Sequence, residues 1–217
     1  MKKYDTILFD LDGTLTDSSP GIVNSIVYAL KKFDISVDDT GKLRKFLGPP
    51  LHESFKMFYG FSDEKAMQAV EYYREYFSTK GILENNVYDG IEELLDTLKH
   101  NGKNLIVATS KPQPFTDRIM EHFDLKKYFT FVAGSNMDGT RSKKGDVIEY
   151  ALGSCNITDR SPVVMVGDRM HDIAGAKSAG MDSIGVEYGY GDYSELKNAG
   201  ATYIVKTVEH LKNLLIG

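Results

Sequence analysis

The sequence predicts an α/β fold, in which a Rossmann-like parallel sheet carries an inserted bundle of helices. Three observations lead to this prediction. Residues 17–81 carry apolar side chains at helical spacing and contain no convincing strand, whereas strand-like runs alternate with helical segments from Val87 onward. One further strand-like run, in residues 4–8, precedes the helical segment and has to join the later strands in one sheet. We therefore expect a core domain of residues 1–16 and 82–217 and a helical cap domain of residues 17–81.

Composition and charge restrict the classes of function. The 217 residues are 41% hydrophobic, which permits a packed core. Their net charge of -5 gives no reason to expect nucleic acid or an anionic membrane as partner. The single cysteine, Cys155, cannot form an intramolecular disulfide, and no adjacent histidine supports a role as nucleophile. Neither a signal peptide nor an apolar run of membrane-spanning length is evident. We expect a cytoplasmic protein that is a monomer or a weak homodimer.

The segment of residues 17–81 is expected to hold four helices. Ser19 suits an N-cap and Pro20 the first helical position. Further helices are expected at about 40–47, 51–59 and 62–80, and the prolines after Gly48 end the first of these. Because the segment leaves the sheet directly after residue 16, we expect it to cover the strand ends as a cap.

The remaining chain repeats the strand–helix unit. Strands are expected at 104–109, 128–133, 162–166, 182–186 and 202–205. Helices are expected at about 90–100, 112–123, 143–152, 171–179 and 208–215, with one more before the last strand. Right-handed crossovers then give a parallel sheet that is covered on both faces.

Two acidic residues follow the first strand, in the run Asp10-Leu11-Asp12-Gly13. If the backbone stays extended, Asp10 and Asp12 project together from the carboxyl end of the strand, where ligands bind in open α/β sheets. Gly13 then permits a sharp turn. Two neighbouring carboxylates repel each other, and a divalent cation would remove that conflict. A polar Asp-Gly turn after a strand is the alternative interpretation.

Hydroxyl and lysine side chains follow the next two strands. Ser110 is able to hydrogen-bond a phosphoryl oxygen at the N-terminus of the next helix, although a helix cap before Pro112 explains it as well. Lys143 and Lys144 open the following helix, where a cation is unusual because helix N-termini favour negative charge. A nearby phosphate would explain this pair, and so would a solvated surface.

A second acidic pair follows the fourth core strand. Asp168 and Asp172 are four residues apart, so they face one centre if a helix begins between them. Carboxylate oxygens suit Mg²⁺, which takes one or two carboxylates together with phosphate and water. A favourable interaction with the helix dipole is the alternative explanation for Asp172.

This series of acidic pair, hydroxyl, lysine and second acidic pair at successive strand ends resembles the motifs of the haloacid dehalogenase-like (HAD) hydrolase superfamily. Residues 47–51, 185–191 and 199–201 are also similar to its phosphoglycolate phosphatase-like branch, which carries a helical cap. One departure concerns the lysine, since Lys143-Lys144-Gly145 stands where many relatives have a lysine before a Pro-x-Pro stretch. We favour Lys144 over Lys143, although the resemblance leaves both open.

The resemblance implies a role for each motif residue. It makes Asp10 the nucleophile and a metal ligand, and Asp12 the acid and base, with its backbone carbonyl on the metal. Ser110 becomes the hydroxyl that binds phosphate, and Lys144 the cation that neutralises it. Asp168 becomes a metal ligand, and Asp172 binds the metal directly or through water. We also assign Gly13 and Thr109 to substrate binding. Arg44 and His52, which flank the Gly48-Pro49-Pro50 loop, are assigned to the far end of the substrate, although solvated cap residues would look the same.

These assignments predict a magnesium-dependent phosphatase that hydrolyses a small phosphate monoester through an aspartyl-phosphate intermediate. The substrate is expected to be a small phosphorylated metabolite: phosphoglycolate, a nucleoside monophosphate or a sugar phosphate. One alternative is a phosphomutase of the β-phosphoglucomutase type, which returns the phosphoryl group to a sugar. Another is a phosphate-binding module without catalytic activity. A dehalogenase is disfavoured because Asp12, Asp168 and Asp172 indicate a metal.

Overall fold

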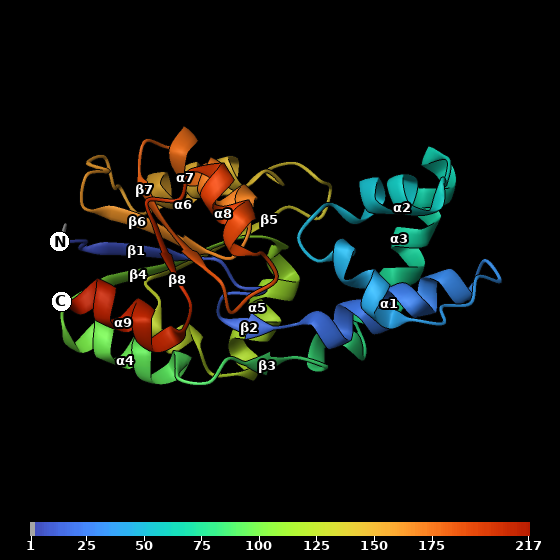
Figure 1. Ribbon diagram of the computed structural model, residues 1–217, viewed down its shortest axis with the longest axis horizontal. Coiled ribbons are helices and arrows are strands. Elements are labelled where there is room, and N and C mark those ends of the chain that lie inside the picture. Colours follow the sequence, from blue (N-terminus) through green and yellow to red (C-terminus); the bar gives the residue numbers. More distant parts are fainter. Residues whose placement is uncertain (1–2) are drawn as a thin grey trace. The chain divides into compact units, whose positions relative to one another are not determined.

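The computed structural model describes residues 3–217. The chain divides into two compact units, one formed by the residues up to Thr16 together with Val87–Gly217 and the other by Asp17–Asn86 (Figure 1). The chain crosses between the units within two short strands, β2 (Thr16–Asp17) and β3 (Asn86–Val87), which pair with each other. In residues 3–217, every helix is too short or too polar to serve as a membrane-spanning segment.

The first unit is built on a six-stranded sheet in the order β5-β4-β1-β6-β7-β8. All of its recorded strand pairs are parallel, which confirms the predicted fold class. The strands are β1 (Thr6–Phe9), β4 (Asn104–Pro112), β5 (Phe131–Ser135), β6 (Val163–Gly167), β7 (Asp182–Val186) and β8 (Tyr203–Val205). β1 therefore lies in the interior of the sheet between β4 and β6, although it comes first in the chain.

Helices cover both faces of this sheet. They are α4 (Ile91–His100), α5 (Gln113–His122), α6 (Lys144–Ser154), α7 (Met170–Ser178), α8 (Tyr193–Ala199) and α9 (Val208–Ile216). Helices α6, α7 and α8 lie on one side of the sheet, and α4 and α9 lie together on the other (Figure 1).

Fully buried apolar side chains join the sheet to α6 and α7. Leu8, Ile106 and Met165 from three neighbouring strands pack in one cluster with Val147 of α6 and Ala176 of α7. Each large aliphatic side chain buried in this way contributes about 1.5–3 kcal/mol to folding. This packing sets the rotation of α6 about its axis, and that rotation decides which residues of its first turn face the sheet.

The bounds of β4 and β5 differ most from the prediction, whereas those of β1, β6 and β8 differ by one or two residues. The expected strand at 128–133 lies at Phe131–Ser135 and follows a short 3₁₀ helix, η3 (Lys126–Tyr128). Its last residues are held in the sheet because the Gly134 amide donates to the Gln113 side chain at 2.6 Å and Ser135 pairs with Pro112. β4 continues to Pro112, beyond the expected end at Thr109, and its register against β5 shifts between Ala108 and Pro112, as in a β-bulge.

The second unit is helical. Its elements are α1 (Ser19–Lys31), η1 (Thr40–Phe46), α2 (Leu51–Tyr59), α3 (Asp63–Phe77) and η2 (Gly81–Leu83). Helix α1 begins one residue earlier than predicted, with Ser18 as N-cap, because the Asp17 carboxylate accepts the Ser19 amide at 3.0 Å. The expected helix at 40–47 is a 3₁₀ helix, whose first turn is closed by the Asp39 side chain accepting from the Gly41 amide.

The boundary between the units lies at Asn86/Val87 rather than at 81/82. The reason is a close backbone approach between α1 and η2. A Cβ atom at Gly21 would overlap the carbonyl oxygen of Gly81, so only glycine allows this contact. The Gly21 amide also donates to the carbonyl of Glu84 at 3.0 Å, which ties residues 81–84 to the helical unit.

Candidate active site

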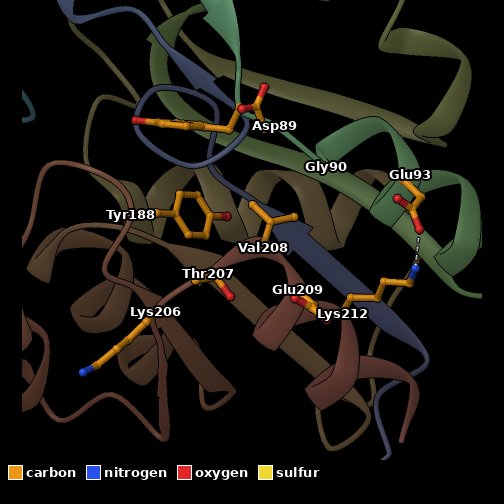
Figure 2. Close-up of a pocket in the computed structure, with 10 residues that line it drawn as sticks. Asp89, Gly90, Glu93, Tyr188, Lys206, Thr207, Val208, Glu209 and Lys212 are labelled. Carbon is orange, nitrogen blue, oxygen red and sulfur yellow. Dashed lines mark hydrogen bonds and ion pairs between the residues drawn. The ribbon is translucent and has the colours of Figure 1, made fainter.

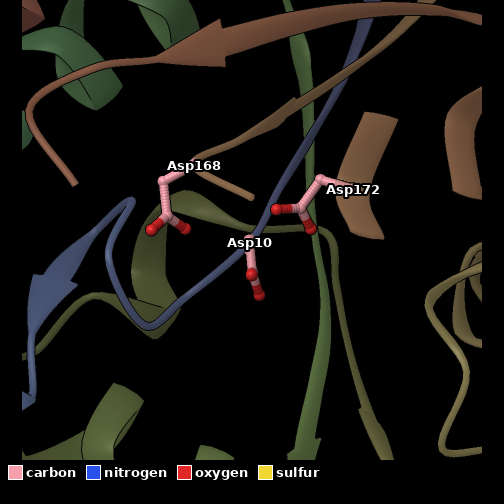
Figure 3. A group of neighbouring side chains, drawn as sticks. All are labelled: Asp10, Asp168 and Asp172. Carbon is pink, nitrogen blue, oxygen red and sulfur yellow. The ribbon is translucent and has the colours of Figure 1, made fainter. Parts of the chain in front are cut away.

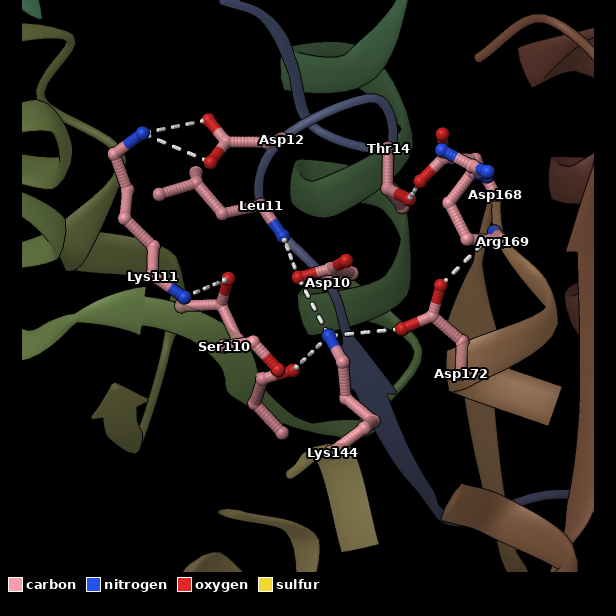
Figure 4. A network of polar contacts seen from close by, with 12 residues as sticks. Asp10, Leu11, Asp12, Thr14, Ser110, Lys111, Lys144, Asp168, Arg169 and Asp172 are labelled. Carbon is pink, nitrogen blue, oxygen red and sulfur yellow. Dashed lines mark hydrogen bonds and ion pairs between the residues drawn. The ribbon is translucent and has the colours of Figure 1, made fainter. Parts of the chain in front are cut away.

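The acidic, hydroxyl and lysine motifs meet at one edge of the sheet. Phe9 of β1 pairs with Val107 of β4 on one side and with Val166 of β6 on the other. Because the strands are parallel, the residues that follow these three positions emerge together at the carboxyl end (Figure 4). Asp10 and Asp168 are thereby brought close to each other from strands that are far apart in the sequence.

Lys144 lies between two of the carboxylates. Its Nζ atom is 2.8 Å from Oδ1 of Asp10 and 2.8 Å from Oδ1 of Asp172, and it donates to the carbonyl of Ala108 at 3.1 Å. Burial lowers the pKa of Lys144, but the two carboxylates raise it more, so that it stands above its usual value and the side chain is charged. Lys143 is exposed as the N-cap of α6. Of the two candidate lysines, the structure therefore brings Lys144 to Asp10.

Asp10, Asp168 and Asp172 form one cluster (Figure 3). One carboxylate oxygen from each lies within 4.8 Å of the others, and Asp168 and Asp172 are buried almost completely. Burial raises the pKa of Asp168 well above its usual value, and the neighbouring charges of Asp172 and Asp10 add to this. Burial also raises the pKa of Asp10, against the opposing charge of Lys144.

The charge balance of this cluster fits a divalent cation. If all three carboxylates are ionised, they and the one ammonium of Lys144 leave two negative charges in a buried site, which is unfavourable without a counter-charge. The donors are hard oxygen atoms, as Mg²⁺ prefers. Asp172 also satisfies the start of α7, since its Oδ2 atom accepts the Arg169 amide at 3.0 Å. Asp172 can therefore serve both in the carboxylate cluster and at the start of α7, because its Oδ1 atom faces Lys144 and its Oδ2 atom faces the Arg169 amide.

Asp12 is turned away from this cluster. Sequence periodicity predicted that the side chains of Asp10 and Asp12 project together, and this prediction is wrong. The chain leaves the extended conformation after Asp10, because the amides of Leu15 and Thr16 both bond back to the carbonyl of Leu11. The Asp12 carboxylate instead pairs with Lys111, whose Nζ atom lies 3.0 Å from Oδ1 and 2.8 Å from Oδ2 (Figure 4). That Asp12 binds a metal through its backbone carbonyl stays a prediction.

Asp168 is held by hydrogen bonds and close packing from the loop after β7 and from the turn that contains Gly13 and Thr14. The Tyr190 amide donates to Oδ2 of Asp168 at 2.8 Å, and the Thr14 hydroxyl donates to Oδ1 at 3.3 Å. A Cβ atom at Gly13, which has a φ of 81°, would overlap the Asp168 carboxylate, and one at Gly189 would overlap Asp168 as well as the Gly13 carbonyl. Gly13 thus contributes by close backbone approach, in addition to the predicted role in the turn.

The two hydroxyl residues after β4 differ in placement. Thr109 is buried, its hydroxyl lowers the pKa of the neighbouring Asp10, and the same hydroxyl accepts the Lys111 amide at 3.2 Å. Ser110 is exposed at the strand end, and its carbonyl accepts the hydroxyl of Ser135 at 2.8 Å. Thr109 is therefore the hydroxyl in contact with Asp10, while Ser110 faces solvent beside it.

Arg44 and His52 both belong to the helical unit. Arg44 is exposed on η1. His52 lies 3.1 Å from Oε1 of Glu53 and 3.6 Å from Oδ1 of Asp63. Their assignment to substrate binding stays a prediction.

Sequence reasoning gave no role to Lys111, and it noted residues 185–191 only for their resemblance, without a role for Tyr188 or Tyr190. Lys111 directly follows Ser110 in the chain, so its place next to the motif was visible in the sequence. The inward direction of the Lys111 side chain, however, depends on the irregular end of β4. Tyr188 is half-buried, and its hydroxyl donates to the carbonyl of Thr14 at 3.2 Å. No residue pattern in the sequence indicates that this loop supports Asp168.

A separate pocket of about 640 Å³ lies where α4 and α9 begin (Figure 2). Tyr188 lines it, and an ion pair of 2.6 Å joins Lys212 to Glu93 at its side. Lysine and carboxylate side chains alternate around it, and none of the clustered aspartates reaches it.

The chain is similar to known proteins over most of its length. The model of the family described as haloacid dehalogenase-like hydrolase matches residues 7–186. A 5'-nucleotidase of Pseudomonas aeruginosa is 43% identical over 213 residues, which are 98% of this chain and 96% of the relative. The tyrosine-protein kinase PtkA of Mycobacterium bovis is 39% identical over 212 residues, 96% of this chain and 72% of the relative. A crystal structure of a predicted phosphatase from Clostridium acetobutylicum superposes with a TM-score of 0.94 and 53% identity, covering 99% of each chain.

The α/β core with its carboxylate-rich strand edge, taken together with the family match, defines the class of this protein as a hydrolase. The chain belongs to the haloacid dehalogenase-like hydrolase family, as the motif series suggested. Within that family it is an enzyme of the phosphatase type.

Proposed function

We propose that this enzyme hydrolyses small phosphate monoesters in a magnesium-dependent reaction that passes through an aspartyl-phosphate on Asp10. The observation that carries the proposal is the contact of Lys144 with Asp10 inside a buried group of three carboxylates. A cation bound by Asp10, Asp168 and Asp172 would supply positive charge for the phosphate oxygens.

Asp10 is oriented for attack. Its Oδ1 atom accepts the Leu11 amide at 2.8 Å and contacts Lys144 at 2.8 Å. Two contacts on one oxygen fix the carboxylate plane, so we assign the in-line attack on phosphorus to Oδ2. Lys144, Thr109 and Ser110 would stabilise the equatorial oxygens, which is the type of contribution that lowers the barrier most.

Asp12 is assigned to proton transfer in both half-reactions. In the first, the Asp10–phosphorus bond forms, the ester P–O bond breaks, and Asp12 gives its proton to the leaving alcohol. In the second, Asp12 takes a proton from water as the water oxygen attacks phosphorus and frees Asp10. Its position outside the carboxylate cluster suits this assignment, because a proton carrier has to exchange with substrate and solvent.

Phosphate release from a panel of phosphorylated metabolites, with and without Mg²⁺, tests the proposal. The wild-type enzyme should release phosphate only with the metal. Asp10→Asn keeps the shape of the side chain but removes its charge, so turnover should fall to background while the unfolding transition stays cooperative. A folded Asp10→Asn enzyme with near-normal turnover would exclude the covalent intermediate.

The similarity to a 5'-nucleotidase supports including nucleoside monophosphates in the panel, beside phosphoglycolate and sugar phosphates. A second candidate function is transfer of the phosphoryl group to a tyrosine hydroxyl, which the 39% identity to a tyrosine-protein kinase favours. Both activities would use the same nucleophile and differ in the acceptor. Incubation with ATP followed by detection of phosphotyrosine, in parallel with free phosphate, separates them.

A further inference from the structure

We propose that Tyr188 is a positioning residue that fixes the orientation of Asp168 and thereby gives the carboxylate cluster a preference for Mg²⁺ over larger divalent cations. Tyr188 does not belong to the cluster of Asp10, Asp168 and Asp172, and it acts on Asp168 through Thr14. This inference rests on the proposed function, because it takes the cluster as the site that binds the metal. It goes further by naming a residue outside the cluster that sets the choice of ion.

Two hydrogen bonds in series link Tyr188 to Asp168. The Tyr188 hydroxyl donates to the carbonyl oxygen of Thr14 at 3.2 Å, and the Thr14 hydroxyl donates to Oδ1 of Asp168 at 3.3 Å (Figure 4). The first bond holds the backbone of Thr14, and the second holds the carboxylate by the side chain of the same residue. The orientation of the carboxylate therefore depends on where Tyr188 holds the turn that contains Thr14.

The Tyr188 ring is itself held in place. It packs edge-on against the ring of Tyr88, with the two ring centroids 5.2 Å apart. The Tyr88 amide donates to the carbonyl of Leu15 at 3.1 Å, so the partner ring is attached to the same turn. An aromatic side chain packed in this way has little freedom, and its hydroxyl gives the Thr14 carbonyl a fixed partner.

Both carboxylate oxygens of Asp168 have a donor. Thr14 donates to Oδ1, and the Tyr190 amide donates to Oδ2 at 2.8 Å. The carboxylate cannot rotate without breaking one of these bonds, and Asp168 is fully buried, so water does not readily replace a lost donor. Backbone packing adds to this restraint, since a Cβ atom at Gly13 or Gly189 would overlap the Asp168 side chain.

A ligand held in this way discriminates between divalent cations. Mg²⁺ requires near-ideal octahedral geometry with ligand distances of about 2.0–2.1 Å, whereas Ca²⁺ accepts about six to eight oxygens at about 2.3–2.6 Å in flexible arrangements. The restrained carboxylate of Asp168 cannot turn to offer both oxygens to a larger ion without losing its donors. Added freedom at Asp168 should therefore weaken the binding of Mg²⁺ more than that of Ca²⁺.

Tyr188→Phe tests the inference, because it removes the hydroxyl and keeps the ring against Tyr88. Melting temperatures of the metal-free protein at increasing Mg²⁺ or Ca²⁺, without substrate, give an apparent dissociation constant for each ion. The variant should weaken Mg²⁺ binding by about tenfold, as loss of an outer partner of a metal ligand does, and Ca²⁺ binding by less than about threefold. An unchanged ratio of the two constants, including an equal loss for both ions, would overturn the inference.

Tyr4→Phe is the matched control. The Tyr4 hydroxyl donates to Oδ2 of Asp182 at 2.8 Å, just before β1 and at the first residue of β7. This variant thus loses a hydrogen bond between a tyrosine and a carboxylate at the opposite edge of the sheet from Asp168. It should keep the wild-type ratio of the two constants even where it lowers stability. A fall of the ratio as large as that in Tyr188→Phe would contradict the specific role of Tyr188.

Thr14→Val tests the route from Tyr188 to Asp168, because it removes the hydroxyl that reaches the carboxylate. It should lower the same ratio, and the double variant with Tyr188→Phe should lose no more Mg²⁺ affinity than Thr14→Val alone. Additive losses would exclude an action through Thr14. If Tyr188→Phe does not fold, Tyr88→Leu, which removes the ring that holds Tyr188, serves in its place. A wild-type protein that neither responds to Mg²⁺ in its melting temperature nor releases phosphate with the metal would instead reject the proposed function, and this role with it.

Discussion

The Nζ atom of Lys144 lies 2.8 Å from an oxygen of Asp10, and the side chains are 4% and 13% exposed. A second carboxylate, that of Asp172, lies at the same distance from the ammonium. Lys144 therefore serves as the shared counter-charge of two aspartates, one that follows β1 and one in the first turn of α7, and its removal should affect both stability and catalysis.

Lys144→Met should lower the free energy of unfolding by about 3–5 kcal/mol in the absence of metal, because it leaves two buried carboxylates without their cation. Turnover should fall by about 100-fold or more, since a charge stabilising the transition state is lost. Urea unfolding and steady-state kinetics measure the two effects. Lys143→Met, which removes an exposed charge from the preceding residue, should change neither by a comparable amount; similar losses in both variants would contradict the assignment to Lys144.

Asp12→Asn and Asp168→Asn should separate proton transfer from metal binding. The Asp12 carboxylate lies outside the cluster of Asp10, Asp168 and Asp172, so Asp12→Asn should slow turnover while Mg²⁺ still raises the melting temperature. Asp168→Asn should remove most of that rise, because a ligand that binds only the folded state stabilises it by mass action. Thermal unfolding with and without Mg²⁺ tests the pair, and an unchanged metal effect in Asp168→Asn would exclude this aspartate as a ligand.

Stabilisation by Mg²⁺ should depend on pH. Burial raises the pKa of Asp168 well above its usual value, so the metal-free folded state holds this proton at a pH where the unfolded chain has released it. The metal-free protein should thus lose stability as pH rises from the unfolded pKa of about 4 toward the raised folded value. A metal has to displace that proton, so its stabilising effect should grow over the same range. Melting temperatures at pH 5 and pH 7, with Mg²⁺ or with a chelator, measure both trends; a larger metal effect at pH 5 would contradict this account.

Gly189→Ala should damage the support of Asp168. The added methyl group would overlap the Gly13 carbonyl and the Asp168 side chain, neither of which is a flexible chain end. We expect a loss of about 1–3 kcal/mol of stability and a weaker metal effect. Gly153→Ala is the matched control, because no atom lies within 4 Å of its added methyl group in α6 and the change removes a flexible residue from a helix. That variant should be neutral or slightly stabilised. If Gly189→Ala behaved in the same way, the loop would not be holding Asp168.

Much of the core fold could be predicted from the sequence, because local pattern carries the necessary information. Apolar runs of strand length alternate with helical spacing after Val87, and that alternation implies a parallel sheet whatever the order of its strands. The positions of Asp10 and Asp168 at strand ends follow from the same pattern, since each stands directly after an apolar run. The end of β4 was less predictable, because its bulge depends on hydrogen bonds from Ser135 and Thr116, which lie on other elements.

By itself, the sequence determined which chemical groups stand at the ends of the strands; the tertiary structure decided which of them meet. The sequence favoured Lys144 over Lys143 without excluding either, and the packing of α6 decides between them by burying Lys144 and leaving Lys143 exposed. Strand alternation predicted that the side chains of Asp12 and Asp10 point the same way. The turn closed by the Leu11 carbonyl instead directs the Asp12 side chain toward Lys111. The physical reason is the same in both cases. Periodicity fixes a side chain's direction only within a regular element, and these residues lie where an element begins or ends, so contacts with distant parts of the chain set their direction.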